Sequence, residues 1–228
     1  VKALGLLAGI EGFALSGEFE PSRWRCTFTI AANDFQRDVL LPPLMTHLQH
    51  MAPGVVLRVI SSNIPSLEML RQENCQLVIS PRPPEGGDVM QKRLFEDSYR
   101  VFYDPKKRDA PKTLADYLAA EHVTVVYEPK RALDVDQWLL SRGVQRHFRV
   151  MVPGLAALSA FVRGSQLLAT APGLLRHHLF KDLGHAAVPM ACPNMPMYMI
   201  WHRRYQTDSA HQWLRAQLSL VAEGVNWD

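Results

Sequence analysis

The stretch from Cys26 to Ile60 reads CTFTIAANDFQRDVLLPPLMTHLQHMAPGVVLRVI. Its first residues, 26–31, alternate in polarity and carry β-branched side chains, which predicts a strand. Leucines then recur at helical spacing from Leu40 to Met51, and Pro53-Gly54 ends that helix. Because residues 55–60 again read as a strand, the stretch predicts a β-α-β unit, which is typical of parallel sheets with right-handed crossovers.

The same alternation continues to the end of the chain. Proline has no backbone N–H, so Pro42 and Pro43 are expected in the first turns of their helix rather than its middle. Further strands are expected at 77–79, 99–103, 123–127, 148–152, 167–170 and 197–201. Helices are expected at 65–72, 114–119, 135–141, 155–162, 173–179 and 209–221. This order predicts two α/β units with a cleft between them.

Composition excludes several classes of protein. The chain has 228 residues, 47% of them hydrophobic, which is enough for one large domain or two small ones. Its net charge of +3 is too small to indicate nucleic-acid binding by this segment alone. The longest charge-free stretch, 150–162, is interrupted by Pro153-Gly154, so no membrane span is predicted. The 3 cysteines are far apart and form no C-x-x-C pair, so a structural zinc site is not indicated and a reducing compartment, the cytoplasm, is favoured.

Catalytic signatures are missing from the sequence. It contains no G-x-S-x-G, G-x-G-x-x-G, P-loop or H-E-x-x-H pattern. We therefore predict no catalytic residue, no metal site and no cofactor. The pair His47 and His50 shares a helix face, but no further ligand stands at metal spacing beside it, and solvated histidines are the favoured interpretation.

Polar residues at the predicted strand ends indicate a site for a small molecule. In open parallel sheets, ligands bind beyond the carboxyl ends of the strands, where helix N-termini present backbone N–H groups. Helix starts after Asn33, Ser62 and Pro153 are expected to converge there. The candidate effector-binding residues are Asn33, Asp34, Phe35, Ser61, Ser62, Asn63, Ser80, Arg82, Tyr127, Glu128, Pro153, Gly154, Thr170 and Trp201.

Arg82 has two interpretations. Its guanidinium could bind a ligand carboxylate through two parallel hydrogen bonds. Alternatively, Arg82 pairs with Asp34 or Glu128, which would line the same cleft and neutralise it.

Several segments resemble, in their order and spacing, the effector-binding domain of LysR-type transcriptional regulators. Gln76 stands where the family's G-x-x-D-L-A-I strand usually has Asp, and Asn74 stands where it often has Gly. The closing segment is most similar to the nodulation and aromatic-degradation branch. The similar segments are Phe28–Ala31, Leu40–Leu44, Ala52–Val55, Asn74–Ser80, Ser165–Pro172 and Met199–His202, followed by Asp208 and Trp213-Leu214.

The resemblance implies an α/β fold of two Rossmann-like subdomains around a central cleft, as in type II periplasmic binding proteins. Residues 22–125 with 200–228 would form the first subdomain and 126–199 the second, with crossovers near 123–127 and 197–201. Residues 1–21 resemble the end of a linker helix, and the winged helix-turn-helix that it would join to this domain is absent from these 228 residues.

The resemblance also implies partners. We expect a small effector in the cleft, an organic or aromatic acid that is held partly by Trp201 or Phe35. DNA would be bound through the missing N-terminal domain, and no membrane partner is expected. A homodimer or homotetramer would place 41–51 and 55–60 against the second subdomain of a partner. The alternatives are a secreted solute-binding protein of a transporter and, with less support, an enzyme with this fold.

Overall fold

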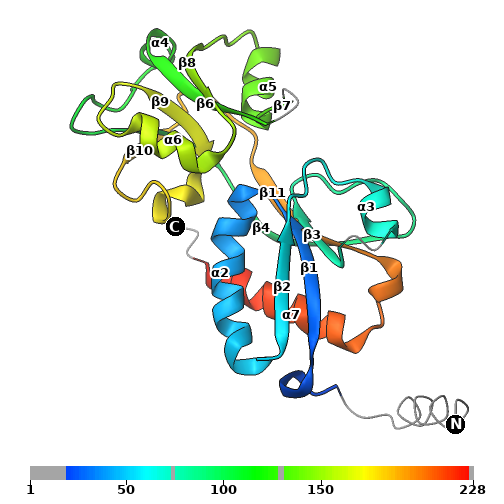
Figure 1. Cartoon of the computed structure of the whole chain (residues 1–228). Helices are drawn as coiled ribbons and strands as arrows, with labels where there is room; N and C mark the ends of the chain where they lie inside the picture. The colour runs from blue at the N-terminus through cyan, green and yellow to red at the C-terminus, as the bar shows by residue number, and fades with distance from the viewer. Residues whose placement is uncertain (1–18, 73–74, 128–130, 226–228) are drawn as a thin grey trace, which may run out of the picture.

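The structure is a computed structural model that describes residues 19–72, 75–127 and 131–225. These residues form two β-sheets, each with its own helices, and the two resulting lobes lie one above the other (Figure 1). The predicted α/β class with two sheets is confirmed.

The first lobe contains a mixed sheet in the order β2-β1-β3-β11-β4. Strand β1 is parallel to β2 and β3, whereas β11 runs antiparallel to β3 and β4. Residues 28–32 are all buried, because helices cover both faces of the sheet. The bounds are β1 Cys26–Ala32, β2 Val55–Ile60, β3 Leu77–Ser80, β4 Val89–Asp97 and β11 Met195–His202, with helices α2 Asp34–Met51, α3 Leu67–Arg71 and α7 Ser209–Gly224.

The second lobe contains the sheet β10-β5-β9-β6, with β7 and β8 both paired to β6. Here β6 is parallel to β8 and β9, and β5 is antiparallel to β9. The bounds are β5 Tyr99–Tyr103, β6 Glu121–Tyr127, β7 Arg131–Ala132, β8 His147–Val152, β9 Leu168–Pro172 and β10 Gly184–Ala187, with α4 Leu114–Ala119, α5 Asp134–Ser141 and α6 Leu155–Val162. Short 3-10 turns are η1 Pro21–Arg23, η2 Gly173–His177 and η3 Arg203–Tyr205.

Helix α2 begins earlier than the sequence suggested. It starts at Asp34, directly after β1, so Pro42 and Pro43 lie in its middle and not in its first turns. That expectation is wrong. Both prolines are exposed, so water can satisfy the carbonyls they leave open. Burial of Leu40, Leu44 and Leu48 on the other face offsets a cost of roughly 3 kcal/mol for an interior proline.

The chain passes between the lobes at different places from those predicted. It leaves the first sheet after Asp97 and enters the second at Tyr99, and it returns between β10 and β11, over residues 188–194. The strand pairing therefore assigns residues 99–127 to the second lobe, whereas the sequence analysis placed 22–125 in the first. Alternation of helices and strands could not show this, because β4 and β5 are separated by Ser98 alone.

The first connection between the lobes, at Asp97 and Ser98, is held to the second lobe by hydrogen bonds from backbone N–H groups. The buried Asp97 carboxylate accepts hydrogen bonds from the N–H groups of Ser98 at 2.7 Å and Leu174 at 3.1 Å. Gly173 donates its N–H to the Ser98 carbonyl at 2.8 Å. A Cβ on Gly173 would lie 2.7 Å from that carbonyl oxygen, so only glycine permits this approach.

A buried ion pair connects α5 to the loop before β8. The side chains of Asp136 and Arg146 form a salt bridge and are 6% and 2% exposed, respectively. Asp136 also accepts a hydrogen bond from the Thr124 hydroxyl, and Arg146 donates to the Tyr117 phenol oxygen at 3.1 Å. Both charges are thus satisfied inside the second lobe.

Removal of one partner should strongly destabilise the protein. Asp136→Ala leaves the Arg146 guanidinium buried without its counter-ion, so we expect the free energy of unfolding to fall by about 3–5 kcal/mol. Urea denaturation measures this loss, and Asp109→Ala, at an exposed carboxylate of the same lobe, is the control. A loss below about 1 kcal/mol, typical of surface pairs, would contradict a buried structural pair.

Candidate functional site

A small cavity lies between the lobes, where the carboxyl ends of β1, β3 and β6 meet the start of β11. Its walls come from both lobes, through the starts of α2, α5 and α6 and the first residues of β5 and β11. Parallel strands with a common direction bring their carboxyl ends to one edge of a sheet, which explains this convergence. The predicted site residues that line the cavity are Asn33, Asp34, Phe35, Asn63, Ser80, Arg82 and Tyr127.

The Asp34 carboxylate lies between two helix N-termini that belong to different lobes. Its Oδ1 accepts a hydrogen bond from the Phe35 N–H of its own helix α2 at 3.1 Å. Its Oδ2 accepts one from the Leu155 N–H, the first residue of α6, at 2.6 Å. The Tyr127 hydroxyl donates a third bond to Oδ1 at 2.6 Å. Helix N-termini favour negative charge, so Asp34 occupies a site built for an anion.

A second polar contact crosses the cleft beside the first. Arg82, which follows β3, donates from Nε to Oδ2 of Asp134 at 3.0 Å and forms an ion pair with Oδ1. Asp134 is the first residue of α5 in the other lobe. Of the two interpretations of Arg82, the structure thus favours pairing, but with Asp134 and not with Asp34. Glu128 lies outside the described residues.

Arg131 is the other cation of the cavity. Its guanidinium lies over the Tyr127 ring, 4.6 Å from the centroid. No carboxylate of the described residues lies within ion-pair distance of Arg131. Burial lowers the pKa of Arg82, and the nearby positive charge of Arg131 lowers it further, as expected for two like charges at one site. Arg131 thus adds a second positive charge to the cavity beside Arg82.

Asn33 organises the loop after β2. Its Oδ1 accepts hydrogen bonds from the Asn63 N–H at 3.0 Å and the Ser61 hydroxyl at 3.2 Å. Its Nδ2 donates to the Asn63 carbonyl at 3.1 Å. Asn63 has φ of 46°, a left-handed conformation that asparagine tolerates better than most residues. Of these three residues, Asn33 and Asn63 line one wall of the cavity.

Six predicted residues that the structure describes do not line the cavity: Ser61, Ser62, Pro153, Gly154, Thr170 and Trp201. The Ser62 side chain is fully buried, and Pro153 and Gly154 precede α6, where a Cβ on Gly154 would lie 3.1 Å from Asp34 Oδ2. Thr170 lies two residues before the end of β9 and bonds to the Tyr117 hydroxyl at 2.6 Å within the core of the second lobe. Trp201 needs a separate explanation. Of the three helix starts expected to converge, the one after Ser62 is not a helix start, because α3 begins at Leu67.

Trp201 lies at the opposite edge of the first sheet. Strand β11 is antiparallel to β3, so it begins at the cleft and ends at the far side of the sheet. Ile200 pairs with Val78 near the start of β3, and Trp201 is one residue farther from the cleft. Its indole N–H donates to Gln206 Oε1 at 2.9 Å, and the Arg215 guanidinium stacks on its ring at 4.3 Å. The expectation that Trp201 holds a ligand in the cleft is thus corrected, whereas Phe35 does line the cavity.

Sequence reasoning missed several cavity residues. Gln36, Tyr99, Arg131 and Asp134 all line it. Arg131 and Asp134 follow the carboxyl end of β6. The rule that ligands bind beyond the carboxyl ends of strands, which selected Tyr127, could therefore have selected them as well. Gln36 reads as an ordinary helix residue, and Tyr99 reads as the start of a strand.

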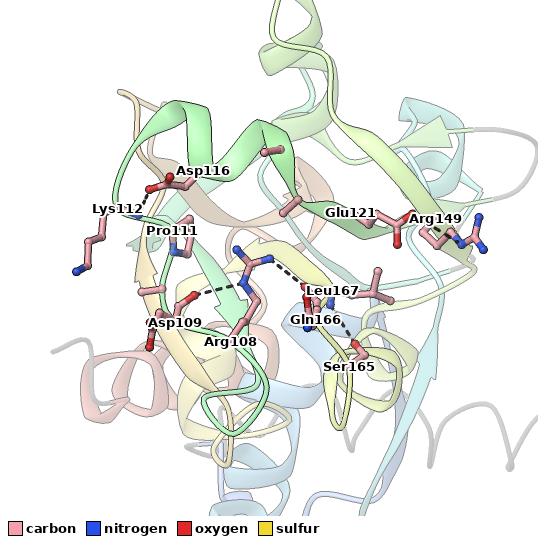
Figure 2. Close-up of a pocket in the computed structure, with 13 residues that line it drawn as sticks. Arg108, Asp109, Pro111, Lys112, Asp116, Glu121, Arg149, Ser165, Gln166 and Leu167 are labelled. Carbon is pink, nitrogen blue, oxygen red and sulfur yellow. Dashed lines mark hydrogen bonds and ion pairs between the residues drawn. The ribbon is translucent and has the colours of Figure 1, made fainter.

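The cavity is closed tightly around its polar groups. Its volume is about 60 Å³, whereas sites for drug-sized ligands measure roughly 300–1,000 Å³. A larger hollow of about 880 Å³ lies at the other edge of the second sheet (Figure 2). There, Arg108 donates to the Gln166 carbonyl at 2.9 Å and Arg149 lies 3.9 Å from Glu121, so these charges already have partners.

Other kinds of site are not found in the part of the chain that the structure describes. Within it, no three His, Cys, Asp or Glu side chains cluster in a way that could hold a metal ion. No helix among these residues is both long enough and apolar enough to cross a membrane.

Comparison with known proteins places the chain among transcriptional regulators. The family model of the LysR substrate binding domain matches residues 22–222. The HTH-type transcriptional activator NahR of Pseudomonas putida is 29% identical over 203 residues, which cover 86% of this chain and 67% of that protein. Nodulation protein D 1 of Sinorhizobium fredii is 24% identical over 86% of this chain and 63% of that protein. The chain thus spans about two thirds of the length of these curated relatives.

Solved structures show the same fold. The regulatory domain of MexT, a transcriptional activator in Pseudomonas aeruginosa, has a TM-score of 0.74 and 25% identity, over 86% of this chain and all of that chain. Full-length CbnR complexed with its target DNA has a TM-score of 0.67 and 15% identity, over 97% of this chain and 79% of that chain. The likeness to CbnR concerns the fold alone. The predicted family, its branch and the two-lobed fold are confirmed.

If Asp34 holds the lobes together, loss of its charge should free the start of α6. We expect Asp34→Asn to accelerate hydrogen exchange of the Leu155 amide by roughly 10- to 100-fold, because hydrogen bonds to a charged group contribute about 1.5–3 kcal/mol each. The matched control is Asp38→Asn in the same helix, whose carboxylate pairs with Arg37 at 2.7 Å on the surface. Equal exchange rates in both variants and the wild type would show that Asp34 does not hold α6.

Proposed function

The chain belongs to the LysR family of transcriptional regulators and forms that family's substrate-binding domain, and from this premise we propose that it senses a small organic acid in the cleft between its lobes. Binding would control the activity of a DNA-binding domain joined to it in a longer chain. We assign no catalytic role, metal or cofactor to it. A role in transcription places the protein in the cytoplasm, which we propose as its location.

The observation that carries this proposal is the pair of internal carboxylates at the cleft. The Asp34 carboxylate accepts hydrogen bonds from the N-termini of two helices, and the Asp134 carboxylate pairs with the Arg82 guanidinium. Each group that could bind a ligand anion is therefore bonded to an anion of the protein itself. A ligand carboxylate has the same charge and the same acceptor geometry. Arg131, which has no carboxylate partner among the described residues, is where we propose that it binds first.

Exchange of carboxylates would link binding to the arrangement of the lobes. With about 60 Å³ available, a ligand of several heavy atoms requires the lobes to separate or rotate. The chain crosses between the lobes twice, which is the connection that permits hinge motion. An effector then shifts the population toward whichever arrangement it binds more tightly.

Arg131 should contribute directly to affinity for acids. We expect Arg131→Ala to weaken binding of a carboxylate by at least tenfold, because a charge-assisted hydrogen bond contributes about 1.5–3 kcal/mol. Isothermal titration with a panel of aliphatic and aromatic carboxylates measures this. The matched control is Arg142→Ala, since Arg142 also stacks on an aromatic ring of the second lobe, 5.2 Å from the Trp138 centroid, but outside the cavity.

Two results would overturn the acid proposal. The first is that no acid of the panel binds to the wild-type protein at millimolar concentration. The second is that an acid binds but Arg131→Ala and Arg142→Ala bind it equally well. Arg82→Ala, tested in parallel, shows whether the carboxylate also replaces Asp134 as the partner of Arg82.

Exposed apolar side chains support the proposed homodimer. Val56 and Val59 are 59% and 40% exposed on β2, an edge strand of the first sheet. Met151 is 61% exposed on β8, an edge strand of the second sheet, and Phe161 is 45% exposed on α6. A two-fold axis that brings the edge strand β2 of one subunit to the second lobe of another would bury these side chains at two equivalent contacts.

Charges on β2 should therefore prevent association. We expect the wild type to dimerise and the double variant Val56→Glu, Val59→Glu to be monomeric at micromolar concentration, because a buried unpaired carboxylate is strongly unfavourable. Analytical ultracentrifugation measures the mass. The control is Leu140→Glu with Leu220→Glu, at two residues that are equally exposed on helices. A monomeric wild type, or a double variant that dimerises normally, would contradict this interface.

The solute-binding and enzymatic alternatives are less well supported. The three cysteines, Cys26, Cys75 and Cys192, are free thiols, which favours a reducing compartment over secretion. Among the described residues of the cleft, the carboxylates of Asp34 and Asp134 are bonded to groups of the protein, so neither is free to act as a general base.

A further inference from the structure

A second cavity lies within the second lobe, beside helix α5. It is enclosed by α5, by the strands β6 and β8 and by the loop between α5 and β8, and we call it the α5 pocket (Figure 1). Its volume is about 310 Å³, within the range of roughly 300–1,000 Å³ that is usual for ligand sites. None of the residues that line it also lines the cleft between the lobes.

Strand β6 separates the α5 pocket from the cleft. Val126 and Tyr127 are neighbours in β6, so their side chains point to opposite faces of the sheet. Val126 lines the α5 pocket, whereas Tyr127 lines the cleft. The two cavities are therefore distinct sites on opposite faces of one strand.

The lining of the α5 pocket is mostly apolar, and part of it is exposed to water. Val126, Val144 and Phe148 line the pocket. Leu140 of α5 and Met151 of β8 also line it, and they are 60% and 61% exposed, respectively. Because removal of apolar surface from water is favourable, a molecule that covers these two side chains gains binding energy from them.

The charged groups of the pocket neutralise one another. Among the described residues that line it, the charged ones are Asp136 and Arg146, which form the buried salt bridge of this lobe. Their further hydrogen bonds join them to the Thr124 hydroxyl and the Tyr117 phenol oxygen, and the Arg146 guanidinium lies 4.9 Å from the centroid of the Phe148 ring. A charged ligand would therefore lose its hydration here without gaining a counter-ion.

We propose that the α5 pocket is a second ligand site, which binds an uncharged apolar molecule with about two rings. The absence of charge on the ligand follows from the paired carboxylate and guanidinium in the pocket wall. Its size follows from the volume, because an apolar cavity of about 150 Å³ holds benzene and the α5 pocket is about twice as large. This inference goes beyond the proposed function and does not depend on it, because the acid site shares no lining residue with this pocket.

The first test changes the charge of the probe and keeps its rings. The probes are tetralin, which has two fused rings and no charge, and its 2-carboxylate and 2-amine derivatives. Each is titrated into the full chain and followed through the methyl NMR signal of Met151, so that binding of the carboxylate in the cleft is not counted. We expect tetralin to bind with a Kd below about 1 mM, and each charged derivative to bind at least about tenfold more weakly.

The second test changes the pocket. In Val144→Trp, the larger side chain fills the space that tetralin needs, so we expect its affinity to fall at least about tenfold. Leu140→Asp gives the same expectation by a route that leaves the core intact, because it places an unpaired charge at an exposed position of the rim. The matched control is Leu220→Asp, at an exposed helical leucine that does not line the pocket, and it should retain the wild-type affinity.

Three results would overturn the proposal. The first is that tetralin leaves the Met151 signal unchanged up to its solubility limit. The second is that the charged derivatives shift this signal with the same affinity as tetralin. The third is that Val144→Trp and Leu140→Asp, shown to be folded by circular dichroism, bind tetralin as well as the Leu220→Asp control.

A further comparison tests whether a second copy of the chain fills the pocket instead. Met151 also belongs to the proposed dimer contact, so an apolar side chain of a partner is the alternative occupant. Tetralin binding that is equal in the wild type and in Val56→Glu, Val59→Glu supports a ligand site. Binding that appears only in this double variant would show that the partner occupies the pocket and would overturn the proposal.

Discussion

One carboxylate, that of Asp34, lies between the amino ends of two helices from different lobes. It accepts hydrogen bonds from the N–H of Phe35 and, at 2.6 Å, from the N–H of Leu155. The partial positive charges of both helix ends are therefore balanced by a single negative group. The position of Asp34 follows directly from the first β-α connection, because the helix begins at the residue where β1 has reached the edge of its sheet. The closed cleft depends on this contact, which the Arg82–Asp134 pair reinforces.

The carboxylates of Asp34 and Asp134 thus fill the anion-binding positions of the cleft. The internal carboxylates stabilise the closed state, and the same helix ends and guanidiniums are what an organic acid needs. If the proposed function holds, Asp34 and Asp134 compete with a ligand for the same partners, and the free-energy difference between the two occupants sets the response.

Much of the fold was predictable from local patterns, and the site only in part. The alternation of β-branched strands with leucine-rich helices predicted two α/β units, and the rule on strand ends selected Asn33, Asp34, Ser80 and Tyr127. The expectation that Trp201 holds a ligand failed, because β11 runs antiparallel to β3 and its carboxyl end therefore lies away from the cleft. Strand direction is set by pairing between segments far apart in the chain, and local sequence does not encode it. For the same reason, the pairing of Arg82 with a residue 52 positions away was not foreseen.

The central claim is that the Asp34 carboxylate holds the two lobes in the closed arrangement. It is tested most directly by the distance between the lobes, measured by electron spin resonance with labels at Glu68 of α3 and Gln137 of α5, two exposed positions on opposite sides of the cleft. The account predicts one narrow distance distribution for the protein with Asp34 and a longer or broader one for Asp34→Asn, with no carboxylate ligand in either sample. Identical distributions for the two proteins would contradict it.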